Sequence, residues 1–97
     1  DEEGYTPLIA AALEGNVECM KLLLAYKADV NKAHPDGWTP LHLAADYGYG
    51  DCIDLLLQYK ADINSRNEDG WTALHKAAEQ GHVECLEKLL NSGADLE

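Results

Sequence analysis

A nine-residue segment occurs three times in this chain at a constant interval. It reads GYTPLIAAA at residues 4–12, GWTPLHLAA at 37–45 and GWTALHKAA at 70–78, an interval of 33 residues each time. Aligned on that period, eleven positions are identical in all three copies. A fixed period of this length indicates a stack of repeated units, because one such unit is too short to bury a core alone. The repetition therefore constrains the fold more than any single motif.

Each copy predicts a pair of helices. Thr39 and its equivalents can accept hydrogen bonds from the free amides of a first helical turn, and Pro40 suits the first helical position. We therefore expect a short helix to begin near residues 6, 39 and 72 and to end at the glycines at 15, 48 and 81, where a left-handed residue is typical. A second helix is expected near 17–26 and its equivalents, because Met20, Leu23 and Leu24 have the spacing of one apolar stripe.

The period, the T-P-L-H-x-A motif and the endings ADVN, ADIN and ADLE resemble the ankyrin repeat. The resemblance covers the whole chain, as one domain over 1–97 with repeats at 1–33, 34–66 and 67–97. It implies an all-α solenoid of helix-turn-helix units with short β-hairpin fingers, whose tips lie near 33–36 and 66–69. The family places glycine at the end of the second helix, whereas this chain has Lys27 and Lys60 there and glycine only at Gly93. A lysine at positive φ costs about 1–2 kcal/mol.

The two end repeats differ in polarity. The first keeps the internal pattern, with Ile9 where the others have histidine, and with Leu22. The third has Lys76 and Lys88 where the earlier repeats have apolar residues. Terminal repeats normally have a polar outer face, so we expect the N-terminal face to expose apolar surface. The chain, which lacks an initiator methionine, is expected to be a piece of a longer array, monomeric or associating end to end through that face.

The net charge of −11 decides between classes of partner. Phosphate backbones are bound by clusters of Lys and Arg, and the sequence has none, so we expect neither nucleic acid nor membrane as a partner. The acids favour a basic protein or peptide; alternatively, they serve only solubility.

One cysteine occupies the same position in each repeat, at Cys19, Cys52 and Cys85. Stacked equivalent helices lie about 8–10 Å apart, farther than the roughly 7 Å that a disulfide allows between Cα atoms. Paired Cys motifs typical of zinc are also missing. We expect three reduced, buried thiols, no metal and no cofactor, and hence a reducing compartment, cytoplasmic or nuclear. With no motif for a nucleophile or a phosphate site, we expect no enzyme.

The resemblance implies that partners bind a concave groove lined by the fingers and first helices. The residues carried over include an aromatic row flanked by acids: Glu2, Glu3, Tyr5, Leu13, Glu14, Asp36, Trp38, Asp46, Tyr47, Arg66, Asp69, Trp71, Glu79 and Gln80. Aromatic residues are enriched in binding hot spots, which favours a basic partner with an apolar anchor. Alternatively, the tryptophans only cover the base of each finger. Tyr26 and Tyr59 are expected to be solvated helix-end residues.

Two other functions stay open. A nucleotide-sensing array would need a basic groove, to which only Arg66 and Lys76 could contribute; a synthetic scaffold would explain copies this similar.

Asn31 and Asn64 resemble the sites of the asparaginyl hydroxylase that modifies ankyrin repeats, because each closes a finger eight residues after a leucine. The alternative is a structural turn asparagine. His42 and His75 are expected to be structural.

Overall fold

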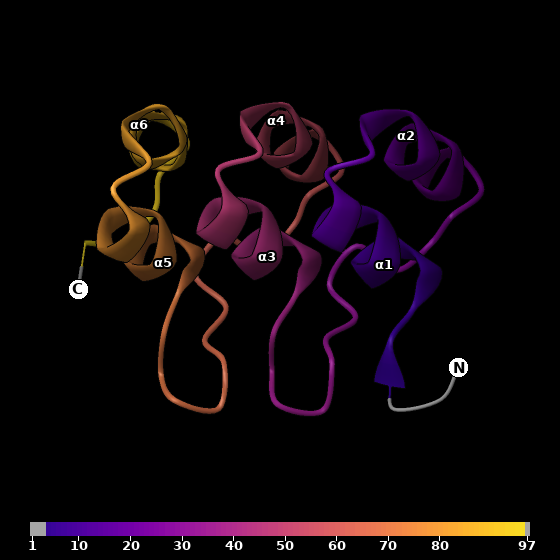
Figure 1. Cartoon of the computed structure of the whole chain (residues 1–97), viewed down its shortest axis with the longest axis horizontal. Helices are drawn as coiled ribbons and strands as arrows, with labels where there is room; N and C mark the ends of the chain where they lie inside the picture. Colours follow the sequence, from indigo (N-terminus) through magenta and orange to yellow (C-terminus); the bar gives the residue numbers. More distant parts are fainter. Residues whose placement is uncertain (1–3, 97) are drawn as a thin grey trace.

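The computed structural model describes residues 4–96 and arranges its helices in two rows (Figure 1). One row contains α1 (Pro7–Glu14), α3 (Pro40–Tyr47) and α5 (Ala73–Gln80), and the other α2 (Val17–Ala25), α4 (Gly50–Gln58) and α6 (Val83–Asn91). Each repeat adds one helix to each row, which confirms the expected all-α solenoid. No helix within 4–96 is long and apolar enough to cross a membrane.

The helices of the first row begin and end where the sequence predicts. The side chain of Thr39 accepts a hydrogen bond from the His42 amide at 3.2 Å, and Thr6 and Thr72 cap α1 and α5 in the same way. A left-handed glycine follows each helix, with φ of 67°, 79° and 72°.

Two of these glycines are also required by a close inter-repeat contact. The ring of Tyr49 lies against Gly15, and the ring of His82 lies against Gly48, so that an added Cβ would come within 2.9 Å and 2.8 Å of them. The Tyr49 hydroxyl and Nε2 of His82 each donate a hydrogen bond to a backbone carbonyl of the preceding repeat. The same position thus joins both pairs of neighbouring repeats.

The helices of the second row end with less favourable residues. Lys27 and Lys60 have φ of 75° and 72°, whereas Gly93 takes the equivalent conformation in the third repeat. The two lysines that replace the family's glycine therefore adopt the left-handed conformation that glycine would take there.

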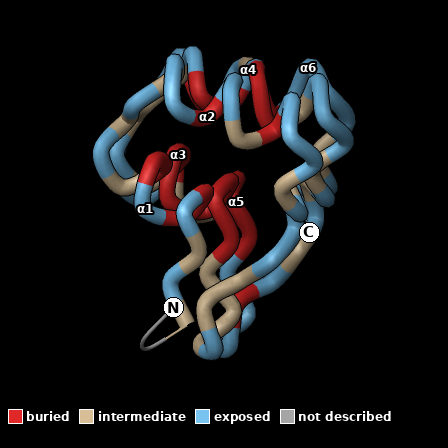
Figure 2. Tube along the Cα trace, turned by 90° about the vertical axis from the view of Figure 1, so that its right-hand side faces the viewer, coloured by how far each residue is buried: buried red, intermediate tan, exposed pale blue. Residues whose placement is uncertain are grey.

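The core lies between the two rows of helices, where the buried segments face one another (Figure 2). Each repeat contributes side chains that are almost fully buried, among them Leu8, Met20, Leu41, Ile53, Leu56 and Leu89. Because these side chains come from both rows, the core runs along the whole stack.

The fingers are turns without strands, so the expected β-hairpins are wrong in that detail: the structure has no strand within residues 4–96. Each tip is closed by a backbone hydrogen bond, from His34 to the Trp38 carbonyl at 3.0 Å in one finger and from Asn67 to the Trp71 carbonyl at 2.9 Å in the next. Amides before the tips bond to aspartate and asparagine side chains instead of an opposite strand, as at Asn31. Side-chain bonds of this kind compete with a strand ladder.

The three cysteines differ in burial, which corrects the expectation that all are buried. Cys52 and Cys85 are 0% and 1% exposed, but Cys19 is exposed. The position faces the preceding repeat, and the first repeat has no described repeat before it.

Candidate functional site

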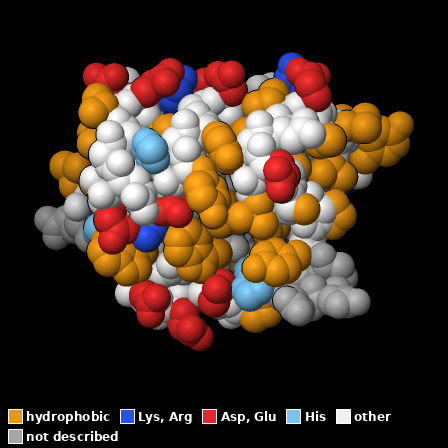
Figure 3. Space-filling model, in the orientation of Figure 1, with side chains coloured by type: hydrophobic (Ala, Val, Ile, Leu, Met, Phe, Trp, Pro, Cys, Tyr) orange, Lys and Arg blue, Asp and Glu red, His pale blue; other side chains and the backbone are white. Residues whose placement is uncertain are grey.

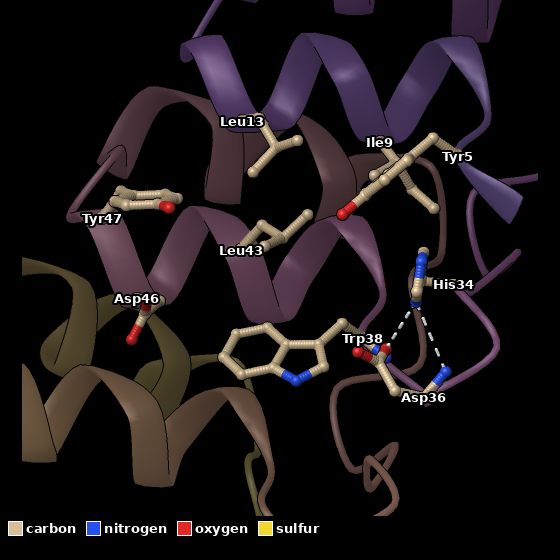
Figure 4. Close-up of a pocket in the computed structure, with 9 residues that line it drawn as sticks. All are labelled: Tyr5, Ile9, Leu13, His34, Asp36, Trp38, Leu43, Asp46 and Tyr47. Carbon is tan, nitrogen blue, oxygen red and sulfur yellow. Dashed lines mark hydrogen bonds and ion pairs between the residues drawn. The ribbon is translucent and has the colours of Figure 1, made fainter. Parts of the chain in front are cut away.

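A pocket of about 250 Å³ opens between α1, α3 and the finger before α3 (Figure 4). Its lining residues come from two repeats: Tyr5, Ile9, Leu13, His34, Asp36, Trp38, Leu43, Asp46 and Tyr47. We call this space the anchor pocket. It lies on a face where hydrophobic side chains gather across the middle and carboxylates lie along the edges (Figure 3).

The anchor pocket has an apolar floor and aromatic walls. Leu43 and Leu13 lie at its centre, the rings of Tyr5 and Tyr47 stand at opposite ends, and the Trp38 indole runs along one side (Figure 4). Leu43 is buried, whereas the two tyrosines are 39% and 50% exposed. The pocket therefore offers apolar surface that an incoming side chain can cover.

Asp36 supplies negative charge at the rim. Its Oδ1 accepts a hydrogen bond from the Trp38 amide at 3.1 Å and lies 3.0 Å from Nδ1 of His34. The His34 ring also lies against Tyr5, with ring centroids 4.6 Å apart. Because the Asp36 side chain remains 46% exposed, its carboxylate is accessible to a cation beside the pocket.

Lys76 lies on the same face, between the two indole rings. Its Nζ is 5.1 Å from the ring centroid of Trp38 and 5.3 Å from that of Trp71. The ammonium group pairs with Glu79 and lies 3.7 Å from Oδ1 of Asp46, and the side chain is only 12% exposed. Hydrogen bonding to Glu79, aided by the Asp46 carboxylate, raises the pKa of Lys76. Asp46 and Glu79, two acids that the sequence suggests for partner binding, are therefore already paired with a lysine of this chain.

The predicted site residues fall into several groups. Those that line the anchor pocket are Tyr5, Leu13, Asp36, Trp38, Asp46 and Tyr47. Those around Lys76 are Trp71, Glu79 and Gln80, the last donating to Asp46 at 3.0 Å. Outside both lie Glu14 on the N-terminal side, the exposed Asp69, and Arg66, which donates to the Gly70 carbonyl at 2.9 Å. Glu2 and Glu3 lie outside the described residues.

Sequence reasoning missed three lining residues and one interaction. Ile9, Leu43 and His34 line the pocket, but none of them is among the binding residues that the sequence suggests. For Leu43 the repeat period does carry a signal, because Leu43 is the equivalent of Lys76 and each follows a tryptophan by five residues. The contact of Lys76 with the tryptophan of the preceding repeat had no such signal.

The tryptophans also pack within their own repeats. The ring of Trp38 lies 5.8 Å from that of His42, and the ring of Trp71 lies 5.5 Å from that of His75. Trp71 nevertheless remains 37% exposed. Covering the finger base and offering surface to a partner are therefore compatible roles.

The two candidate hydroxylation residues join neighbouring repeats. Asn31 accepts a hydrogen bond from the Asp62 amide at 2.7 Å, and Asn64 accepts one from the Asp95 amide at 2.8 Å. Both asparagines are exposed. A structural role is thus visible, and hydroxylation stays a prediction.

The N-terminal face of the stack carries a second, apolar hollow of about 420 Å³. It is lined by Pro7, Ala10, Ala11, Glu14, Asn16, Cys19, Leu22 and Leu23. Leu22 is 61% exposed there, whereas its equivalent Leu55 is 8% exposed because the preceding repeat covers it. The expected apolar N-terminal face is therefore present.

Comparison with known families agrees with this architecture. A family model for ankyrin repeats matches residues 1–67 and 33–97, with three copies along the chain. A search of curated proteins found no match. Ankyrin repeats are generally protein–protein interaction modules and are typically non-catalytic. The match extends over the entire chain, and each copy has its helix pair: the chain belongs to the ankyrin repeat family.

Proposed function

We propose that this chain is a non-catalytic interaction module whose anchor pocket receives an apolar side chain of a basic protein or peptide. The observation that carries the proposal is an apolar floor surrounded by three aromatic rings, with an exposed carboxylate at the rim. Aromatic side chains provide a large contact area and dominate the energetics of many interfaces.

The charge of the partner follows from the balance of the whole chain. The chain has eighteen acidic and seven basic residues. A partner with a basic surface is therefore attracted to it over a distance and associates with it faster at low salt. Asp36 is the pocket residue best placed to meet a lysine or arginine beside the anchor, because Asp46 is already engaged with Lys76 and Gln80.

The nucleotide-sensing alternative has weaker support. It depends on Arg66 and Lys76, and Lys76 is paired with two carboxylates while Arg66 donates to the backbone of its own finger. An anionic ligand would have to compete with those contacts.

Alanine variants test the proposal once a partner has been isolated by affinity capture. Loss of a central aromatic anchor typically costs about 2 kcal/mol or more, so Trp38→Ala should weaken binding about 30-fold. Asp36→Asn should weaken it less, mainly by slowing association, and the loss should shrink at high salt.

Tyr59→Ala is the matched control, because Tyr59 follows α4 in the second row and is 38% exposed. Circular dichroism should show that each variant is folded. If Tyr59→Ala weakens binding more than Trp38→Ala, the binding site does not lie at the anchor pocket.

End-to-end association is a second proposal, carried by the exposed Leu22 in the N-terminal hollow. Leu22→Lys places there the residue that the third repeat has at Lys88, so it should fold. Sedimentation should show wild-type chains that are monomeric when dilute and associate as their concentration rises, and Leu22→Lys should reduce that association. Identical sedimentation of the two chains would contradict the proposal.

A further inference from the structure

The anchor pocket has a counterpart one repeat further along the stack. The pocket lies between Tyr5 and Trp38, and its central floor residue is Leu43. Moving by one period of 33 residues gives Trp38 and Trp71 as the flanking rings and Lys76 as the central residue. The positions of Ile9, Leu13 and Tyr47 become His42, Asp46 and Gln80, so the rings are the apolar part of the counterpart. The two positions can therefore be compared directly.

Lys76 occupies the space that its counterpart leaves open. Its side chain is two heavy atoms longer than that of leucine, and its Nζ reaches a point just over 5 Å from each indole centroid. Glu79 and Asp46 hold the ammonium group there, and the side chain is 12% exposed. Leu43 ends below the surface, and the space above it is the anchor pocket.

The chemistry of the open pocket favours an aliphatic occupant over a cation. Lys76 extends outward from the helix, so its charge reaches carboxylates near the surface. A lysine entering from a partner would instead point its ammonium group at Leu13 and Leu43 at the centre of the pocket. Of the two lining carboxylates, Asp46 is already engaged with Lys76 and Gln80, and Asp36 lies at the rim. Burying an unpaired charge against apolar side chains is costly, whereas an aliphatic side chain gains from covering them.

We infer that Lys76 closes the space between Trp38 and Trp71, the counterpart of the anchor pocket one repeat on, so that a partner presents one aliphatic anchor (leucine, isoleucine or methionine) and not two anchors one repeat apart. The inference rests on the proposed function and names the anchor that the pocket takes. It makes Lys76 a specificity-determining residue.

The two tryptophans allow a direct test without a natural partner. The chain is labelled with fluorotryptophan, so that fluorine NMR reports Trp38 and Trp71 as separate signals. Isobutanol is titrated as a mimic of the leucine side chain, and n-butylammonium as a mimic of lysine. In the wild-type chain, isobutanol should shift the Trp38 signal saturably and leave the Trp71 signal in place, and n-butylammonium should act more weakly.

Two substitutions exchange the states of the pockets. Lys76→Ala, which places there the residue that the first repeat has at Ala10, should make the Trp71 signal respond to isobutanol. Leu43→Lys should fill the anchor pocket and weaken the Trp38 response about tenfold. Thermal melts check folding, and the Lys76→Ala result stands even if Leu43→Lys does not fold.

Three results would overturn the inference. These are a Trp71 response in the wild-type chain equal to that of Trp38, an unresponsive Trp71 in folded Lys76→Ala, and n-butylammonium binding as tightly as isobutanol. The proposed function fails on a different measurement, the effect of Trp38→Ala on partner binding, so the two failures are distinguishable.

Discussion

His42 joins two repeats through both nitrogens of its ring. Nδ1 accepts a hydrogen bond from the Thr39 amide at 3.1 Å, which completes the cap of α3, and Nε2 donates to the Trp71 carbonyl at 2.7 Å. Both contacts are satisfied by a neutral imidazole protonated on Nε2. Burial lowers the pKa of His42, because a buried imidazolium loses hydration. The structural role that the sequence suggests for this histidine is therefore visible.

The stability of the fold should depend on pH through His42. Below its ordinary pKa of 6.5, the unfolded chain takes up a proton that the folded chain resists, so stability should fall as pH drops below that value. His42→Ile, which copies Ile9 of the first repeat, should cost about 1–2 kcal/mol at pH 7.5 through lost hydrogen bonds. It should also flatten the decline between pH 7.5 and 5.5. Urea unfolding across this range measures both effects, and an unchanged pH dependence in the variant would contradict the assignment.

The three thiols should react at two different rates. Cys19 is exposed, whereas burial excludes reagents from Cys52 and Cys85 and raises the pKa of both thiols. Because the thiolate is the reactive form, a small thiol reagent should label one cysteine quickly and two only as the chain opens. Mass spectrometry of quenched samples identifies the fast site. Equal rates at all three positions would mean that the packing of α4 and α6 differs from this structure.

Asn31 and Asn64 should gain one oxygen each on treatment with the asparaginyl hydroxylase that modifies ankyrin repeats. Both side chains are exposed, and the third repeat has Glu97 at this position. Peptide mass spectrometry should show the gain on the two asparagine peptides and none on the C-terminal peptide. Unchanged masses of both asparagine peptides would contradict the prediction and leave the two residues with a structural role only, through their inter-repeat hydrogen bonds.

At the scale of single elements, the helices could be predicted from sequence and the finger backbone could not. Thr, Pro and Gly act locally at helix ends, so residues 6, 15, 39 and 48 were enough to bound α1 and α3. Whether a finger forms strands depends on where its amides find acceptors. Here they bond to side chains such as Asp29 and to the neighbouring finger, and residue composition does not reveal that choice.

The ends of α2 and α4 offer a way to stabilise the array. Lys27 and Lys60 are held at positive φ, which costs about 1–2 kcal/mol relative to glycine before the greater freedom of glycine in the unfolded chain is counted. Lys27→Gly and Lys60→Gly should each raise the free energy of unfolding by about 1 kcal/mol. Lys27→Ala is the control, because it removes the charge and keeps the strain. A gain in the alanine variant equal to that in the glycine variant would show that charge, not φ, is responsible.

At the scale of the whole molecule, the period predicts which positions line up but not which contacts they make. The aromatic row follows from the alignment of Tyr5, Trp38 and Trp71. The difference between its two halves arises from Lys76 reaching across to Trp38 of the preceding repeat, whereas its equivalent Leu43 is too short to extend in this way. The exposure of Cys19 has the same origin, since burial at that position depends on a neighbouring repeat.

The central claim is that a partner binds over α1, α3 and the finger before α3. Amide hydrogen exchange of the chain with and without its partner measures this most directly. Binding should slow exchange in residues 4–14 and 33–47 and leave α4 (Gly50–Gln58) and α6 (Val83–Asn91) unchanged. Protection confined to the second row of helices, with residues 33–47 unaffected, would contradict the account.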